Sequence, residues 1–212
     1  MKRSFILAVL LTVIVGSAAQ AAVVRVPEDQ PTIQAGIAAA VDGDTVLVAD
    51  GTYRGDGNRD ISFQGKGITV RSSNGADACI IDCESLGRAF LFTAGETAAA
   101  VLAGFTIAHG ASPSEQQGNM EYSAGGAVLI EGSCPVISGC RFVECQANVD
   151  ADAHVTLSAG GAVYLRSADV RIRNCQFSGC LANVLSGAQY SGVARSCGDS
   201  DWHLSRITIS YH

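Results

Sequence analysis

The feature that most restricts the fold of this chain is an internal repeat with a period of 35 residues. The segment Ala124–Val128 reads AGGAV, and the same five residues return at Ala159–Val163. The same step relates further matching residues: Ile137 to Ile172, Cys140 to Cys175, Phe142 to Phe177 and Cys145 to Cys180. A step of 35 residues toward the N-terminus from Ile137, Cys140 and Phe142 reaches the apolar residues Leu102, Phe105 and Ile107. A fixed period of this length is typical of units that stack and bury a continuous core.

Within each unit, inward and outward residues alternate over short runs. Cys140 and Phe142 flank Arg141, and Cys175 and Phe177 flank Gln176. Such alternation, bounded by Gly, Ser and Asn, predicts short half-buried strands, and the 24 glycines supply the turns between them. The sequence therefore predicts an all-β parallel solenoid of roughly five coils, with neighbouring strands about 4.8 Å apart. The expected inward ladders are Leu102/Ile137/Ile172, Phe105/Cys140/Cys175 and Ile107/Phe142/Phe177.

The N-terminal half carries less regular strand signals and one helix. The expected strands are short apolar runs: Thr45–Val48, Ile61–Phe63, Ile68–Val70, Cys79–Ile81 and Ala89–Phe92. A helix is expected from Pro31 to about Val41, because proline suits a first helical turn and Ile33 and Ile37 share one face. The first coil of a solenoid has an open apolar end, so we expect this amphipathic helix to cap it.

The first 21 residues have the pattern of an export signal. Lys2 and Arg3 precede an apolar run from Phe5 to Val15, and Ala19–Ala21 offers a small-residue cleavage site. This run is shorter than the about 20 residues of a membrane-spanning helix. We therefore predict a signal peptide at 1–21, a cap segment at 22–44, coils at 45–192 and an irregular final coil at 193–212. The expected location is extracellular or periplasmic, or on the outer cell surface, with no membrane span.

The regular pattern ends near residue 192. A third AGGAV segment is due close to residue 194, but Val193–Cys197 stands there instead. One last strand is expected at Ile207–Ile209. We expect the chain to be a truncated or frame-altered piece of a longer repeat protein, with an incomplete final coil.

Charge argues against two classes of partner. The formal net charge is −6, with 14 basic and 20 acidic residues. This balance provides no basic patch for nucleic acid or for an anionic membrane, so neither is an expected partner.

The eight cysteines fall into pairs where the repeat is regular. Cys140 and Cys175 are predicted to stack in the core as small apolar residues, while Cys145 and Cys180 stack at a corner. A spacing of about 4.8 Å lies within the range of Cα separations that a disulfide accepts. We expect thiols at the inner pair, and either state remains open for the corner pair.

The opening of the chain is similar to that of right-handed parallel β-helix proteins of the pectate-lyase-like superfamily. The similar segments are Pro31–Gln34, Gly43–Val46 and Gly51–Tyr53. The GGAV segments and the Phe-x-x-Cys-x-Ala segments resemble the GGAI and FxxN repeats of polymorphic outer-membrane protein adhesins, with Cys145 and Cys180 where those repeats carry Asn. The resemblance implies a right-handed parallel β-helix that is either a non-catalytic glycan-binding scaffold or an enzyme of the pectate lyase or pectinesterase type.

The enzyme alternative lacks an obvious site in the sequence. A lyase of this kind needs clustered acidic residues for Ca²⁺ beside a basic residue, and Ca²⁺ takes six to eight oxygen ligands. Arg171 and Arg173 point outward together, but the preceding unit carries Val136 and Ser138 beneath them, so a solubilising role is favoured. No other cofactor and no metal site is expected.

The remaining acidic and histidine residues are better explained by surface ion pairs and solvated loops than by catalysis or metal binding. The repeat places His109 beneath Glu144, a pair that could exchange a proton but is more typical of a surface ion pair. It also places Glu131 beneath Arg166. Asp150, Asp152 and His154 lie close enough in sequence to ligate a metal, although a solvated acidic loop is the favoured interpretation. No catalytic residue is therefore assigned.

The loops between units are the favoured binding site. Ser112–Ser123, Asp150–Ser158 and Ser186–Ser191 are expected at the same corner of successive coils. The amide and aromatic side chains expected to bind an extended polysaccharide are Gln117, Asn119, Tyr122, Gln189 and Tyr190. We call this set the loop shelf. The predicted function is a secreted or cell-surface scaffold that binds polysaccharide or a cell-surface glycan without catalysis.

Overall fold

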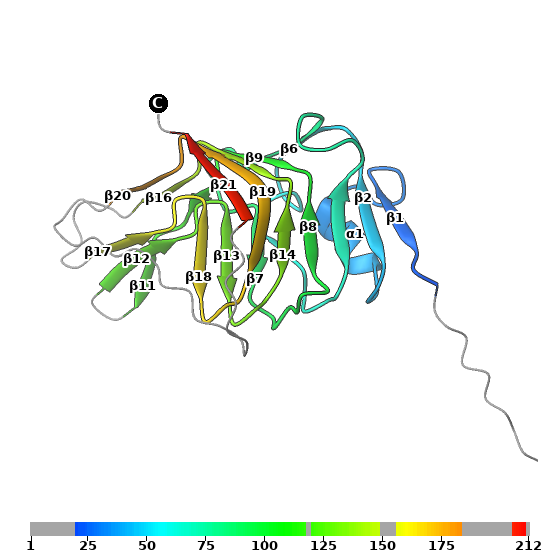
Figure 1. The fold of residues 1–212 in the computed structure, drawn as a ribbon, viewed down its shortest axis with the longest axis horizontal. Coiled ribbons are helices and arrows are strands. Elements are labelled where there is room, and N and C mark those ends of the chain that lie inside the picture. The colour runs from blue at the N-terminus through cyan, green and yellow to red at the C-terminus, as the bar shows by residue number, and fades with distance from the viewer. Residues whose placement is uncertain (1–19, 118–119, 149–155, 184–204, 211–212) are drawn as a thin grey trace, which may run out of the picture.

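In the computed structural model, the regular secondary structure of the described residues consists mostly of parallel strands, with one helix near the N-terminal end (Figure 1). The structure describes residues 20–117, 120–148, 156–183 and 205–210. All paired strands run parallel except β11 and β12, which form an antiparallel hairpin. Apart from this hairpin, neighbours in each sheet are separated in sequence by tens of residues, so each of these pairings joins one unit of the chain to the next.

The first ladder of strands forms one side of the molecule. Its members follow the chain from unit to unit: β1 (Val23–Val26), β2 (Thr45–Val48), β5 (Thr69–Ser72), β8 (Val101–Ala103), β14 (Val136–Ser138) and the first half of β19 (Arg171–Ser178). Val46, Val70, Leu102, Ile137 and Ile172 are paired in series across these strands. All five are buried, so this row lines the core.

A second ladder belongs to the same sheet, because the long strand β19 is continuous with both ladders. Its members are β3 (Gly51–Tyr53), β6 (Cys79–Asp82), β9 (Thr106–Ala108), β15 (Arg141–Val143), the second half of β19 and β21 (Ser205–Ser210). Ile81, Ile107, Phe142 and Phe177 are paired in series. The rings of Phe142 and Phe177 stack with their centroids 4.8 Å apart and an interplanar angle of 8°.

Three smaller sheets complete the strands. The four-stranded sheet contains β4 (Ile61–Ser62), β7 (Phe90–Phe92), β13 (Val128–Glu131) and β18 (Val163–Arg166). A three-stranded sheet contains β10 (Ala111–Ser112), β16 (Gln146–Asn148) and β20 (Leu181–Asn183). The last contains β11 (Glu115–Gln117), β12 (Met120–Ala124) and β17 (Thr156–Ala159).

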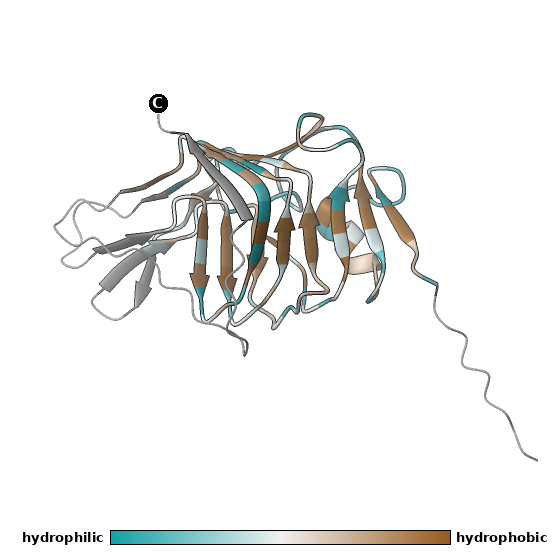
Figure 2. Ribbon diagram, viewed as in Figure 1, coloured by the Kyte–Doolittle hydropathy of each residue, from teal (hydrophilic) through white to brown (hydrophobic). Residues whose placement is uncertain are grey.

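The core lies between the ladders and is continuous along the stack. Phe63 packs on Phe92 at 4.5 Å between ring centroids, and Phe90 contacts Phe105 at 6.3 Å. These four rings are fully buried. Figure 2 shows hydrophobic residues along successive strands of the stack. Because burial alternates along the strands, with outward positions partly or fully exposed, the core is formed by one face of each sheet.

The 35-residue register predicted from the sequence is confirmed by the strand pairings. Ile137 is paired with Ile172, and Val128 with Val163, each 35 residues apart. The five strands predicted in the N-terminal half correspond to β2, β4, β5, β6 and β7, with differences of one or two residues at their ends. The predicted strand at Ile207–Ile209 lies within β21.

The corners of successive units share a left-handed backbone conformation. Gly139 and Asn174 have φ of 61° and 52°, and Glu144 and Gly179 have φ of 51° and 62°. Each pair again differs by 35 residues, so the turn geometry repeats with the strands. Gly and Asn adopt positive φ more readily than most residues, which explains why they occupy three of these four corners; Glu144 is the exception.

The two glycines of each AGGAV segment have different roles. Gly125 has φ of 67° and makes the turn, whereas Gly126 has no positive φ. A Cβ on Gly126 would lie 2.0 Å from the carbonyl oxygen of Gly161 and 2.5 Å from that of Gln146. The first glycine is therefore required by the turn, and the second by the close approach of the next unit.

The single helix, α1 (Ile33–Ala39), contacts β1, β2 and β4 (Figure 1). It lies within the predicted range of residues 31–41, with Ile33 and Ile37 buried. The Thr32 hydroxyl accepts a hydrogen bond from the backbone N–H of Ala35 at 3.2 Å, as an N-cap does. At the other end, Lys66 Nζ donates to the carbonyl oxygens of Ile37, Ala38 and Ala40 at 2.7, 3.0 and 2.8 Å.

A side chain of α1 also pairs with the backbone of strand β4. The Gln34 Nε2 donates to the carbonyl of Ser62 at 3.1 Å, and Gln34 Oε1 accepts from the N–H of Ser62 at 2.8 Å. The amide thus occupies the place that a neighbouring strand would take. It satisfies backbone groups of a strand at the end of its sheet.

Candidate functional site

The predicted loop shelf is only partly within the described residues. Gln117 lies on β11 and Tyr122 on β12, the two strands of the antiparallel hairpin. In that hairpin, Tyr122 is paired with Glu115 and Gln117 with Met120, and β12 then pairs with β17. The structure therefore brings Gln117 and Tyr122 onto one hairpin. Asn119, Gln189 and Tyr190 lie outside the described residues, so the shelf as a whole remains a prediction.

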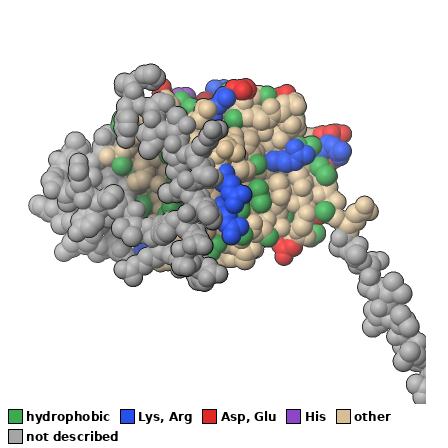
Figure 3. All heavy atoms as spheres, viewed as in Figure 1, with side chains coloured by type: hydrophobic (Ala, Val, Ile, Leu, Met, Phe, Trp, Pro, Cys, Tyr) green, Lys and Arg blue, Asp and Glu red, His purple; other side chains and the backbone are tan. Residues whose placement is uncertain are grey.

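A second candidate is the outer side of the first ladder, which we call the arginine face. It consists of the outward residues of β2, β5, β8, β14 and the first half of β19: Thr45, Leu47, Thr69, Arg71, Val101, Ala103, Val136, Ser138, Arg171 and Arg173. None of these ten residues is acidic. Figure 3 views this side, and shows blue Lys and Arg side chains across it, with red Asp and Glu side chains near its margins.

Arg71 and Arg173 stand in one row of this face. Strand pairing connects Arg71 to Ala103, Ala103 to Ser138 and Ser138 to Arg173. Three strand steps separate the two arginines, a span of about 14 Å at a typical strand spacing. The two residues between them, Ala103 and Ser138, have small side chains, so the longer arginine side chains lie on either side of a shallow strip of the sheet surface. Arg171 and Arg173 are both exposed, as expected from the sequence.

The arginines of this face differ from most others in having no acidic partner among the described residues. Within the described part of the chain, no ion pair involves Arg71, Arg171 or Arg173, and Arg71 Nη1 donates only to the Ser72 carbonyl at 3.4 Å. By contrast, Arg59 contacts Glu84, Arg141 contacts Asp77 and Arg166 contacts Glu131. The predicted pairing of Glu131 with Arg166 is confirmed at 3.0 Å.

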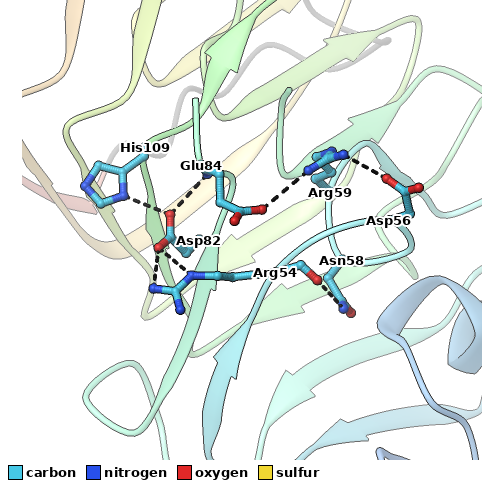
Figure 4. Close-up of polar contacts among 7 residues, drawn as sticks. All are labelled: Arg54, Asp56, Asn58, Arg59, Asp82, Glu84 and His109. Atoms are coloured by element: carbon cyan, nitrogen blue, oxygen red, sulfur yellow. Dashed lines mark hydrogen bonds and ion pairs between the residues drawn. The ribbon is translucent and has the colours of Figure 1, made fainter. Parts of the chain in front are cut away.

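Four charged side chains form a cluster of ion pairs at the end of the second ladder of strands. Asp82 is the last residue of β6, and Arg54, His109 and Glu144 directly follow β3, β9 and β15; we call these four residues the polar ladder. Arg54 donates to Asp82 Oδ2 from Nε at 3.0 Å and from Nη2 at 2.8 Å. His109 Nδ1 lies 2.8 Å from Asp82 Oδ1, and its Nε2 lies 3.4 Å from Glu144 Oε2. Figure 4 shows Asp82 between Arg54 and His109.

Neighbouring residues hold the polar ladder in place. Asp82 Oδ1 also accepts the backbone N–H of Glu84 at 3.1 Å, and the Asn58 amide donates to the Arg54 carbonyl at 3.0 Å. Arg59 contacts the carboxylates of Asp56 at 2.8 Å and Glu84 at 3.4 Å (Figure 4). Four successive units of chain are thereby connected by charged side chains.

These contacts change the acidity of both central groups. Burial acts to raise the pKa of Asp82, but the hydrogen bonds from His109, Arg54 and the Glu84 backbone outweigh it and lower the pKa to about 2. The hydrogen bond to Asp82 raises the pKa of His109, against a smaller opposing effect of burial. With a carboxylate at each ring nitrogen, His109 is stabilised as the imidazolium and has no free nitrogen to act as a base.

The sequence predicted one half of the polar ladder and missed the other. The His109–Glu144 pair is confirmed, because it lies in the regular part of the repeat. Arg54 and Asp82 were missed, since the step from β3 to β6 is 28 residues and from β6 to β9 is 26. Comparing residues that lie 35 positions apart therefore does not align Arg54 with Asp82 or Asp82 with His109.

Metal ligands do not cluster in the part of the chain that the structure describes. No group of three or more His, Cys, Asp or Glu residues suited to a metal ion occurs there. Asp150 and Asp152, which the sequence suggested as ligands in an acidic loop, lie outside the described residues, as does His154. The described helix is also too short to span a membrane.

Comparison with known proteins gives no match. No protein-family model, curated protein or solved structure is significantly similar to the chain.

Proposed function

We propose that the chain is a right-handed parallel β-helix, secreted or held at the cell surface, whose arginine face binds acidic polysaccharide without catalysis. The chain would leave the cell through the signal peptide at 1–21. The series of parallel pairings at 35 residues supports the β-helix, and the contacts of α1 with β1, β2 and β4 support its role as the N-terminal cap.

The observation that carries the binding proposal is the arginine face itself. The chain has a net charge of −6, yet this face presents three arginines without an acidic residue among its outward positions. Arginine donates paired hydrogen bonds to carboxylates, which favours a polymer that carries carboxylate groups. The shallow strip of Ala103 and Ser138 leaves room for a chain to cross between the guanidinium groups. Repeated strands at a regular spacing suit a ligand that is itself repetitive.

The loop shelf would extend the same binding surface or replace it. In this reading Gln117, Asn119, Tyr122, Gln189 and Tyr190 supply hydrogen bonds and aromatic contacts to sugars. The shelf does not select for acidic polymers, since its residues are uncharged. The two surfaces therefore predict different ligand preferences.

The test is titration calorimetry of the secreted protein with polygalacturonate and with a neutral galactan. The triple variant Arg71→Gln/Arg171→Gln/Arg173→Gln is expected to bind polygalacturonate at least tenfold more weakly, with a smaller salt dependence. The matched control is Arg59→Gln/Arg141→Gln/Arg166→Gln, which removes the same charge from arginines that already have acidic partners. Equal losses in both triple variants, or no binding of polygalacturonate, would overturn the proposal.

Two further outcomes separate the alternatives. If affinity is lost in Tyr122→Ala/Tyr190→Ala and kept in the arginine variant, the loop shelf is the binding site. The enzyme alternative rests on the neighbouring outward pair Arg171 and Arg173. Formation of unsaturated uronide products from pectin, with Ca²⁺ and dependent on either arginine, would establish a lyase in place of a binding scaffold.

A further inference from the structure

Two pairs of cysteines stack across β15 and β19 in the same way. Cys140 directly precedes β15, and Cys175 occupies the equivalent position within β19. Cys145 and Cys180 each lie two residues after the end of these strands. Each pair is separated by 35 residues, and each follows a corner residue with positive φ. The backbone contacts are also equivalent: the N–H of Gln176 donates to the carbonyl of Cys140 at 3.0 Å, and that of Leu181 to the carbonyl of Cys145 at 2.9 Å.

The sulfur of the later cysteine in each pair points toward the unit that carries the earlier one. Cys180 Sγ donates to the carbonyl of Phe142 at 3.5 Å, and Cys175 Sγ donates to the carbonyl of Ile137 at 3.9 Å. Cys140, Cys145, Cys175 and Cys180 are free thiols in the structure. Adjacent strands place Cα atoms within the range that a disulfide accepts.

Exposure distinguishes the two pairs. Cys140 and Cys175 are 0% and 1% exposed, and β21 pairs with β19 directly at Cys175. Cys145 is buried as well, but Cys180 is partly exposed, and its neighbour Leu181 is 55% exposed. The corner pair therefore contains one partly exposed cysteine, whereas both cysteines of the inner pair are buried.

We propose that Cys145 and Cys180 are a modification site, at which an external disulfide of the glutathione class converts the two thiols into a disulfide between neighbouring units. The Cys180 thiolate attacks one sulfur of the external disulfide, forming a mixed disulfide and releasing one thiolate. Cys145 then loses its proton, and its sulfur attacks Cys180 Sγ and displaces the second thiolate. Two cysteine thiols are oxidised, one external disulfide is reduced, and the two protons pass to the released thiolates.

The environment of Cys180 suits the first step. The neighbouring side chain of Cys145 lowers the pKa of Cys180, while burial opposes this effect. The same neighbour effect, together with burial, raises the pKa of Cys145. The more exposed cysteine thus forms the thiolate more readily, and the thiolate is the attacking species.

The test is peptide mapping of the folded, full-length protein after incubation with oxidised glutathione. The protein is then unfolded in acidic denaturant, the remaining thiols are alkylated with a maleimide, and the protein is digested without reduction. Cleavage after Arg141 separates Cys140 from Cys145, and cleavage after Phe177 separates Cys175 from Cys180. We expect a cross-linked peptide that joins Cys145 to Cys180 and lacks the mass of two hydrogen atoms. Cys140 and Cys175 are expected to be alkylated.

Each alternative product would overturn the proposal. These products are a Cys140–Cys175 disulfide, a bond from Cys180 to another cysteine, glutathione retained on Cys180, or no oxidation at all. Thermal unfolding of the wild type gives a second readout, since the oxidised form should melt at a higher temperature and dithiothreitol should reverse the shift. Cys145→Ser is expected to retain glutathione on Cys180, whereas Cys140→Ser should still form the corner disulfide.

Discussion

The ring nitrogen Nδ1 of His109 lies 2.8 Å from Oδ1 of Asp82, although 27 residues separate them in the sequence. This contact joins one unit to the next at a corner, where the backbone of His109 has φ of 50°. Glu144, one unit further on, faces the other ring nitrogen at 3.4 Å. The polar ladder is therefore expected to stabilise the fold, and its contribution to the free energy of unfolding must depend on pH.

The first prediction concerns that pH dependence. The pKa of His109 is raised above its ordinary 6.5, so its contribution is fully present below about pH 6.5 and is lost as pH rises through the raised value. The pKa of Asp82 is lowered from 3.8 to about 2, so its contribution is present above about pH 4 and is lost as pH falls toward 2. We expect the Tm difference between wild type and His109→Asn to be largest between these limits. Asn tolerates the positive φ, so the variant changes the charge and preserves the turn.

Nuclear magnetic resonance provides the direct control for this prediction. The imidazole of His109 should titrate above pH 6.5 in the wild type and closer to its ordinary value in Asp82→Asn. An unshifted His109 titration in the wild type would show that the ion pair is absent in solution.

The second prediction concerns the second glycine of the AGGAV segment. Gly126→Ala is expected to destabilise the fold by about 3 kcal/mol or more, because its Cβ would overlap backbone atoms of Gly161 and Gln146 that cannot rotate away. Gly132→Asn is the control, since Gly132 has positive φ and open space around it. Urea denaturation should show a large loss for the first variant and a change below about 1 kcal/mol for the second. Similar losses in both would contradict the steric argument.

The third prediction concerns the C-terminal end of α1. Lys66→Met keeps most of the aliphatic side chain but removes three hydrogen bonds to helix carbonyls. We expect a loss of about 1.5–3 kcal/mol in the free energy of unfolding, the range for hydrogen bonds to charged groups. Lys66→Arg retains the charge and should recover part of this loss. If Lys66→Met unfolds at the same denaturant concentration as the wild type, the ammonium group is not a significant cap.

The fourth prediction concerns the amide of Gln34. Gln34→Glu replaces the donor to the Ser62 carbonyl by a second acceptor, so it should cost more than Gln34→Met, which removes both hydrogen bonds without adding repulsion. We expect about 1–3 kcal/mol for Gln34→Glu by denaturation at pH 7. Lowering the pH below the pKa of the new glutamate should restore part of the stability. An equal effect of both variants at all pH values would mean that the amide pairing is unimportant.

Sequence reasoning was most successful where the repeat is regular. It placed Ile137 opposite Ile172, Phe142 opposite Phe177 and Glu131 opposite Arg166, because one step of 35 residues holds for all of them. It also located α1, since Ile33 and Ile37 form an apolar stripe, although the helix begins at Ile33 and Pro31 precedes its N-cap, Thr32.

The arginine face and half of the polar ladder could not be found in this way. Arg71 reaches the row of Arg173 only through a first step of 32 residues, from Arg71 to Ala103. The step from Val46 to Val70 is 24 residues, and that from Phe90 to Val128 is 38. Loops of different length absorb these differences, and no periodic pattern in the sequence reveals which residues they bring together. Three-dimensional structure is needed to align such units.

The unequal steps between paired strands have a consequence for engineering this protein. Strand pairing fixes the register only within the paired strands. The loops that connect the strands can therefore change in length while the sheets keep their alignment. The hairpin of β11 and β12, inserted between β10 and β13, is a natural example of such added length. A foreign peptide grafted there should leave the core untouched, whereas one extra residue within β14 would turn Ile137 toward solvent.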